Sequence, residues 1–201
     1  MKVEMFSRLR KSISGIFRYS RAEEYSRRYA VMNAFDGVIT VLGIIFGSVL
    51  LGQAAVKQIL AAGIGASIAM GISGASGTYM TEKAEQERKI KEIEEAMLVK
   101  LDGTVIVKAR ERAAIISAIV DSLSAMLAGL VVLTPYFAAA LGLLTSEIAF
   151  HLSTVISFAL LFGLGIFLGK IAKKDIIRSG IKSLVVGLVT LLLIIALNLI
   201  L

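Results

Sequence analysis

The sequence predicts an all-α, polytopic membrane protein with five transmembrane helices and a cytoplasmic helical extension between spans two and three. The composition indicates this class, because 57% of the 201 residues are hydrophobic and the mean hydropathy is +0.83. Soluble domains average only about 45–50% apolar residues. Five apolar runs also approach the ~20 residues that cross the hydrocarbon core. The predicted spans are residues 31–55, 58–81, 113–134, 148–169 and 182–201.

A basic segment, residues 1–28, precedes the first span and is set apart from the membrane domain, residues 29–201. Between residues 3 and 19, apolar side chains recur at helical spacing with Arg and Lys between them. This pattern is typical of an amphipathic helix that lies on an anionic membrane leaflet. A poorly ordered basic tail is the alternative.

The first span contains Asp36, a carboxylate within an otherwise apolar run. Insertion scales put its cost at about 2.5–3.5 kcal/mol, so such residues are usually functional. Thr40, Gly43 and Gly47 follow on the same helical face. This polar and small face suits close helix packing and an ion path. A carboxyl group that is merely satisfied by its neighbours is the alternative.

The second span is rich in Gly, Ala and Ser, which allow close helix packing in lipid. It also contains Met70. A thioether is a soft ligand that suits Fe²⁺ better than Mg²⁺, although a buried methionine is more often a filler of gaps in the core. No Gly or Pro interrupts residues 78–102. We therefore expect one helix of about 40 residues, roughly 60 Å long, that extends into water.

The extension belongs to a predicted cytoplasmic module, residues 82–112, that is rich in carboxylates. They include the i,i+3 pairs Glu82 with Glu85 and Glu92 with Glu95. Carboxylates at this spacing share a helical face and can bind one divalent ion. Glu87 and Glu94 lie nearby and Glu111 follows the turn. A solvated helix with i,i+4 Glu–Lys pairs would have much the same sequence.

The third span begins after the turn at Asp102-Gly103 and ends at Pro135, the only proline. Its charged residue is Asp121, near the middle, which is a second candidate ligand. The serine hydroxyls around Asp121 could instead satisfy a protonated structural carboxyl. Residues 136–147 form an apolar outer connection.

At the outer edge of the fourth span, Glu147 and His151 form an i,i+4 pair that we interpret as an interfacial pair in water; a proton or ion role is the alternative. The span ends in Gly165-x-x-x-Gly169, a second face for close packing. A basic loop at 170–181 then leads to the fifth span.

The distribution of charge predicts the orientation. Of the 22 Lys and Arg residues, eight lie in 1–28, eight in 83–112 and five in 170–182. Lys57 alone falls on the opposite side. By the positive-inside rule, the N-terminus and both basic connections are cytoplasmic, and the C-terminus is on the other side. We expect the cell membrane as the location. The basic charge then needs no nucleic-acid partner.

The residue inventory excludes several kinds of site. With no cysteine and one histidine, the chain cannot hold a disulfide or a thiolate-bound metal. No nucleotide-binding motif and no nucleophile–base set is visible. We therefore expect no enzyme activity and no prosthetic group. Any metal ion would be held by carboxylates, thioether sulfur, hydroxyls or carbonyls.

The motifs resemble those of the vacuolar iron transporter family from residue 27 onward. Asp36, Gly37 and Thr40 match the D-G-x-x-T of the family's first span, and residues 73–82 are similar to its S-M-x-x-G-E-Y-x-S stretch. The sequence departs from that stretch at Gly74 and Thr78, where the family has Met and Glu.

The resemblance implies a homodimer whose first spans line a path for Fe²⁺ or Mn²⁺, exchanged for protons. It also implies a cytoplasmic module that collects ions. Asp36 would be the central carboxylate and Thr40 an auxiliary ligand. Met70 would replace the missing thioether, and Asp121 the missing carboxylate. The collecting residues would be Glu82, Glu85, Glu92 and Glu95.

The leading hypothesis is a proton-coupled divalent-cation transporter that moves Fe²⁺ or Mn²⁺ out of the cytoplasm. Two alternatives stay open. A membrane scaffold or regulatory subunit would keep the fold without transport, and a passive cation channel would be insensitive to a pH gradient.

Overall fold

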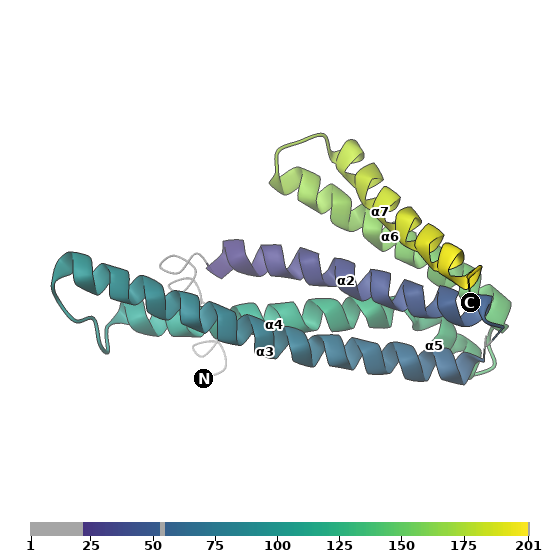
Figure 1. Ribbon diagram of the computed structural model, residues 1–201, viewed down its shortest axis with the longest axis horizontal. Helices are drawn as coiled ribbons and strands as arrows, with labels where there is room; N and C mark the ends of the chain where they lie inside the picture. The colour runs from purple at the N-terminus through teal and green to yellow at the C-terminus, as the bar shows by residue number, and fades with distance from the viewer. Residues whose placement is uncertain (1–21, 53–54, 201) are drawn as a thin grey trace, which may run out of the picture. The chain divides into compact units, whose positions relative to one another are not determined.

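A computed structural model describes residues 22–52 and 55–200, and every regular element in these ranges is a helix (Figure 1). Five of the helices are long and apolar enough to span a membrane, which confirms the predicted all-α, five-span class. The elements in chain order are α2 (Ala22–Leu50), α3 (Val56–Met97), α4 (Val105–Val132), α5 (Thr134–Ala140), α6 (Ser146–Ile171) and α7 (Ile176–Asn198). The predicted basic segment, residues 1–28, falls mostly outside the described residues.

Helix α3 confirms the prediction of one long helix between the second span and the turn that follows it. It has 42 residues, so its axis is about 63 Å long. It ends where Leu98 takes a left-handed conformation, with φ of 54°. Gly103, with φ of 74°, then makes the turn into α4, and the amide of Thr104 donates to Leu101 O at 3.1 Å.

The chain forms two compact units. Of the described residues, unit 1 comprises 22–30 and 72–122, and unit 2 comprises 31–52, 55–71 and 123–200. In unit 2 the core is built on α2, α3, α4, α5 and α6. Its largest fully buried members include Leu42, Ile45, Ile59, Leu133 and Tyr136.

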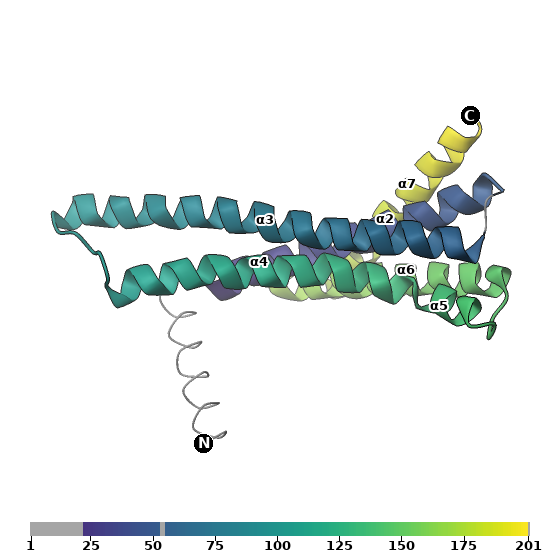
Figure 2. The same cartoon turned by 90° about the horizontal axis from the view of Figure 1, so that it is seen from below.

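Small residues bring α6 and α7 together within unit 2; the two helices run next to one another in Figure 1, and Figure 2 shows that α7 crosses α6 at an angle. A Cβ added at Gly165 would lie 2.4 Å from Ser183 Oγ, and one at Gly180 would lie 2.4 Å from the Phe162 ring. A Cβ at Gly169 would lie 2.8 Å from the side chain of Ser179. The predicted packing face at Gly165 and Gly169 is therefore confirmed.

The start of the fifth span and the connection before the fourth span differ from the sequence prediction. Helix α7 begins at Ile176, six residues before the predicted boundary at 182. The reason is a cap, because Asp175 Oδ1 accepts from the amides of Ile177 at 3.0 Å and Arg178 at 3.2 Å. Part of the predicted outer connection is also helical, as α5, which has Pro135 in its first turn.

Candidate functional site

Asp36 and Thr40 lie on an exposed face of α2, one turn apart. The adjacent Gly37 is buried and faces α4, because a Cβ there would lie 2.3 Å from the carbonyl oxygen of Ala125. Only glycine permits this approach of two backbones. The contact at Gly37 therefore fixes which side of α2 packs inward, and leaves the carboxylate of Asp36 on the outer side of unit 2.

Met70 also belongs to unit 2 and is half-buried on α3. Ser67, one turn before it, is fully buried, and its hydroxyl donates to Gly63 O at 2.8 Å. Within the described residues, no three Asp, Glu or His side chains are gathered in an arrangement that could hold a metal ion.

Asp121 is enclosed in unit 1, where it is only 2% exposed. The hydroxyl of Thr78 donates a hydrogen bond to its Oδ2. A Cβ added at Gly74 would lie 3.1 Å from the same oxygen. The carboxylate from α4 therefore lies against Gly74 and Thr78, the two positions at which the sequence departs from the family motif.

Glu82 lies inside unit 1 as well and is 5% exposed. The Tyr29 hydroxyl donates to its Oε1 at 2.9 Å, and Gln86 Nε2 donates to its Oε2 at 3.4 Å. Arg110 Nη1 in turn donates to Gln86 Oε1 at 2.9 Å. The Gln86 amide thus connects a carboxylate to a guanidinium, with its NH₂ toward the negative charge and its oxygen toward the positive one. This arrangement stabilises a buried carboxylate.

The sequence alone does not predict the contacts that Tyr29, Gln86 and Arg110 make around Glu82. One local signal was present, because Gly74, Thr78, Glu82 and Gln86 follow one another at four-residue spacing on α3. Residues at this spacing share a helical face, so the polar members could have been recognised as one buried row. Their partners on α2 and α4 lie 53 and 24 positions away and leave no local pattern.

The other predicted collecting residues lie on the surface of residues 82–97 of α3, which we call the α3 extension, and basic side chains pair with two of them. Arg88 contacts Glu85 at 2.9 Å and Glu92 at 2.6 Å, and Lys89 contacts Glu85 at 3.1 Å. Arg88 and then Lys89 lower the pKa of the Glu85 carboxyl to about 2. Glu95 is exposed. Glu82 and Glu85, which were expected to share one face, therefore have different environments.

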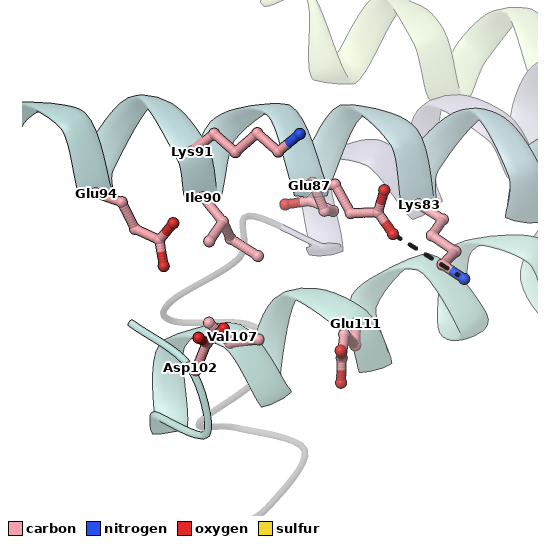
Figure 3. A pocket seen from close by; sticks show the side chains of 9 residues that line it. Lys83, Glu87, Ile90, Lys91, Glu94, Asp102, Val107 and Glu111 are labelled. Atoms are coloured by element: carbon pink, nitrogen blue, oxygen red, sulfur yellow. Dashed lines mark ion pairs between the residues drawn. The ribbon is translucent and has the colours of Figure 1, made fainter. Parts of the chain in front are cut away.

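A cavity of about 240 Å³ lies in unit 1 between the α3 extension and the start of α4 (Figure 3). Glu94 lines it on the side of α3, and Asp102 and Glu111 line it on the side of the turn and α4. Lys83 forms a long ion pair with Glu87 at 4.0 Å. The full lining is Lys83, Gln86, Glu87, Ile90, Lys91, Glu94, Asp102, Val107 and Glu111. The cavity is thus lined by a mixture of carboxylates and ammonium groups.

Comparison with known proteins links this architecture to metal-ion transport. The family model of the VIT family matches residues 91–197. An uncharacterized protein of Methanocaldococcus jannaschii is 33% identical over 178 residues. The match covers 87% of this chain and 89% of that relative. The similarity therefore extends over nearly the whole membrane domain.

Proposed function

Because the chain belongs to the VIT family, an integral membrane family of metal-ion transporters, we propose that it exchanges Fe²⁺ or Mn²⁺ for protons and exports the metal ion from the cytoplasm. The observation that carries the proposal is the exposed carboxylate of Asp36 on an apolar span, with the Thr40 hydroxyl one turn deeper. Oxygen ligands of this kind bind Mn²⁺ and Fe²⁺. A carboxylate in a low-dielectric path is also suited to carry either a proton or a cation.

In this mechanism the Asp36 carboxylate alternates between a metal-bound and a protonated state. Binding of a divalent ion expels the proton, and protonation on the far side releases the ion. Thr40 adds a neutral oxygen ligand. The thioether of Met70 would favour Fe²⁺ over Mg²⁺, since soft ligands discriminate against hard cations. Asp121 would contribute a second carboxylate only after the Thr78 hydroxyl gives up its hydrogen bond.

The outward position of Asp36 supports a homodimer. A carboxylate that faced lipid would cost about 2.5–3.5 kcal/mol on insertion scales. A second copy of α2 against the exposed face would remove this cost and place two Asp36 carboxylates around one path. Gly47, farther along α2, has open space for a second helix, since no atom lies within 4 Å of a Cβ there, whereas Gly43 lies against Ile194 of α7 in the same chain.

The α3 extension would concentrate cations at the cytoplasmic entrance. Its exposed carboxylates Glu85, Glu92 and Glu95 would bind ions transiently, with Arg88 and Lys89 giving way at Glu85 and Glu92. Glu82 would join them only after it gives up its hydrogen bonds from Tyr29 and Gln86. The orientation that we propose places the N-terminus in the cytoplasm and the C-terminus on the opposite side, as the excess of Lys and Arg predicts. A cell membrane location accompanies this orientation.

The test is Mn²⁺ and Fe²⁺ flux in proteoliposomes with an imposed pH gradient. Asp36→Asn keeps the size of the side chain and removes its charge, so we expect flux to fall to background. Asp102→Asn, at the exposed turn before α4, is the matched control and should transport like the wild type. Flux by Asp36→Asn at the wild-type rate would refute the mechanism. Flux that does not depend on the pH gradient would indicate a passive channel instead of an exchanger.

A further inference from the structure

A cluster of cations occupies the turn between α6 and α7. We call this the α6–α7 turn and define it by five basic residues, all of them exposed: Lys170, Lys173, Lys174, Arg178 and Lys182. Asp175 is the one acidic residue between positions 170 and 182, so five positive charges and one negative charge leave a net charge of +4. This charge lies within 13 consecutive residues.

The charge on the α6–α7 turn is poorly neutralised by the protein. Oδ1 of Asp175 accepts from two backbone amides at the start of α7. Its Oδ2 lies 4.0 Å from Arg178, whose side chain is 84% exposed. The α3 extension is different, since Lys83, Arg88 and Lys89 each pair with a glutamate there. An anion from outside the chain would therefore find uncompensated cations at the α6–α7 turn.

The backbone of the α6–α7 turn holds these cations in defined positions. The amide of Lys174 donates to Gly169 O at 3.0 Å and that of Lys173 to Lys170 O at 3.3 Å, which is the Schellman arrangement at a helix C-terminus. Lys173 takes φ of 51°, a left-handed conformation that favours glycine. Close packing of Gly169 against Ser179 ties the two helices together directly beside the turn.

Apolar side chains accompany the cations. Ile171, Ile176 and Ile177 are 46%, 43% and 65% exposed. Only four residues, 172–175, connect the two membrane-spanning helices, so the turn cannot move away from the membrane surface. Lysine and arginine at such a depth extend their charged groups toward the headgroups while their stems and neighbouring isoleucines contact acyl chains.

We propose that the α6–α7 turn is a binding site for the headgroups of anionic phospholipids. The phosphodiester would accept hydrogen bonds from the Lys173 and Lys174 ammonium groups and from the Arg178 guanidinium, and the isoleucines would contact the upper part of the acyl chains. Charge complementarity selects an anionic lipid over a zwitterionic one. The proposal is independent of which ion the protein transports, because none of these residues belongs to the proposed metal path.

The test measures binding of phosphatidylglycerol to the purified full-length protein in detergent by native mass spectrometry, with phosphatidylcholine as the neutral reference. One variant carries Lys170→Gln, Lys173→Gln and Lys174→Gln. The matched control carries Lys57→Gln, Lys100→Gln and Lys108→Gln, which removes the same charge at other exposed positions. Since each cation near an anionic surface contributes about fivefold, we expect the first variant to lose at least tenfold in phosphatidylglycerol affinity.

The control should keep wild-type preference for phosphatidylglycerol. Equal losses in both triple variants, or no loss in either, would overturn the proposal. Inorganic phosphate at the same phosphate concentration should not displace the lipid, and displacement would identify a free anion as the ligand instead. If the glutamine variant does not fold, the triple Lys→Arg variant replaces it. That variant must retain lipid binding, and wild-type binding must fall as salt rises.

Discussion

At the scale of single residues, unit 1 contains a buried carboxylate, Glu82, that is stabilised by hydrogen bonds from neutral donors. Glu82 accepts hydrogen bonds from Tyr29 and Gln86, and Gln86 in turn accepts a hydrogen bond from Arg110. The Nε atom of Arg110 is buried and has no hydrogen-bond partner among the described residues. The guanidinium therefore has an unused donor next to this chain of hydrogen bonds.

Removal of the Tyr29 hydroxyl should destabilise the protein. Tyr29→Phe leaves Glu82 Oε1 without its donor at 2.9 Å, and hydrogen bonds to charged groups contribute about 1.5–3 kcal/mol. We expect a loss of free energy of unfolding in that range, measured by denaturant unfolding in detergent micelles. Tyr79→Phe is the control, because the Tyr79 side chain is 39% exposed and its contact with Lys83 uses only the ring. Equal effects of the two substitutions would contradict the role given to Tyr29.

At the scale of helices, close backbone approaches decide which faces are buried. The contact between Gly37 and Ala125 determines the orientation of α2, and pairs of Ser and Gly do the same for α6 and α7. The ion pairs of the α3 extension are a different case, since they lie in water and stabilise a helix that has few core contacts. Such surface pairs contribute little individually.

A methyl group at Gly37 should disturb the packing of α2 on α4. Gly37→Ala places a Cβ 2.3 Å from a backbone carbonyl oxygen, which cannot rotate away. Overpacking of this kind costs about 1–3 kcal/mol, and we also expect slower Mn²⁺ flux because Asp36 is the adjacent residue. Gly163→Ala is the control, since no atom lies within 4 Å of a Cβ there. Thermal unfolding with fluorescence detection would compare the two, and a stable Gly37→Ala protein would disprove the contact.

Acid should weaken the ion pair of Glu85 in the α3 extension. The pKa of Glu85 is lowered from 4.5 to about 2 by Arg88 and Lys89. The stabilising effect is therefore present above pH 4.5 and is lost as the pH falls toward 2. NMR titration of the carboxyl carbon should show this low pKa in the wild type and a value closer to 4.5 in Arg88→Gln. An unchanged pKa in the variant would exclude Arg88 as the cause.

At the scale of the whole molecule, the homodimer that we propose would form through the exposed face of α2. Asp36 and Thr40 are exposed on α2, and a partner copy would cover them. The absence of cysteine from the sequence makes this prediction simple to test, because an introduced cysteine is the only thiol.

Thr40→Cys should form a disulfide-linked dimer under mild oxidation in liposomes. The expectation follows from the homodimer proposal, in which the exposed faces of two α2 helices meet. Val155→Cys is the control, since Val155 is 65% exposed and belongs to a different helix, α6. Non-reducing electrophoresis gives the result. Dimers of both variants in equal amounts would indicate random collision, and no dimer of Thr40→Cys would contradict the interface.

The sequence was sufficient for the class of fold, because hydropathy and helix-breaking residues are local properties. It predicted the unbroken helix α3 for the same reason. It did not predict the environment of Glu82, since Tyr29 lies 53 positions away and periodicity carries no information about such a partner. The start of α7 was placed too late because the apolar run begins after Lys182, whereas the cap at Asp175 lets the helix begin at Ile176. The assignments of Asp36, Met70 and the glutamates to metal binding stay predictions.

At Lys173, the residue that would give the most stable fold differs from the residue that would bind lipid best. Its left-handed backbone, with φ of 51°, would suit glycine, and relief of such strain typically gains about 1–2 kcal/mol. A search for thermostable variants would therefore favour Lys173→Gly, the substitution that also removes a cation from the lipid-facing turn. The Lys173→Gly variant should therefore unfold at a higher temperature than the wild type and bind anionic phospholipid more weakly.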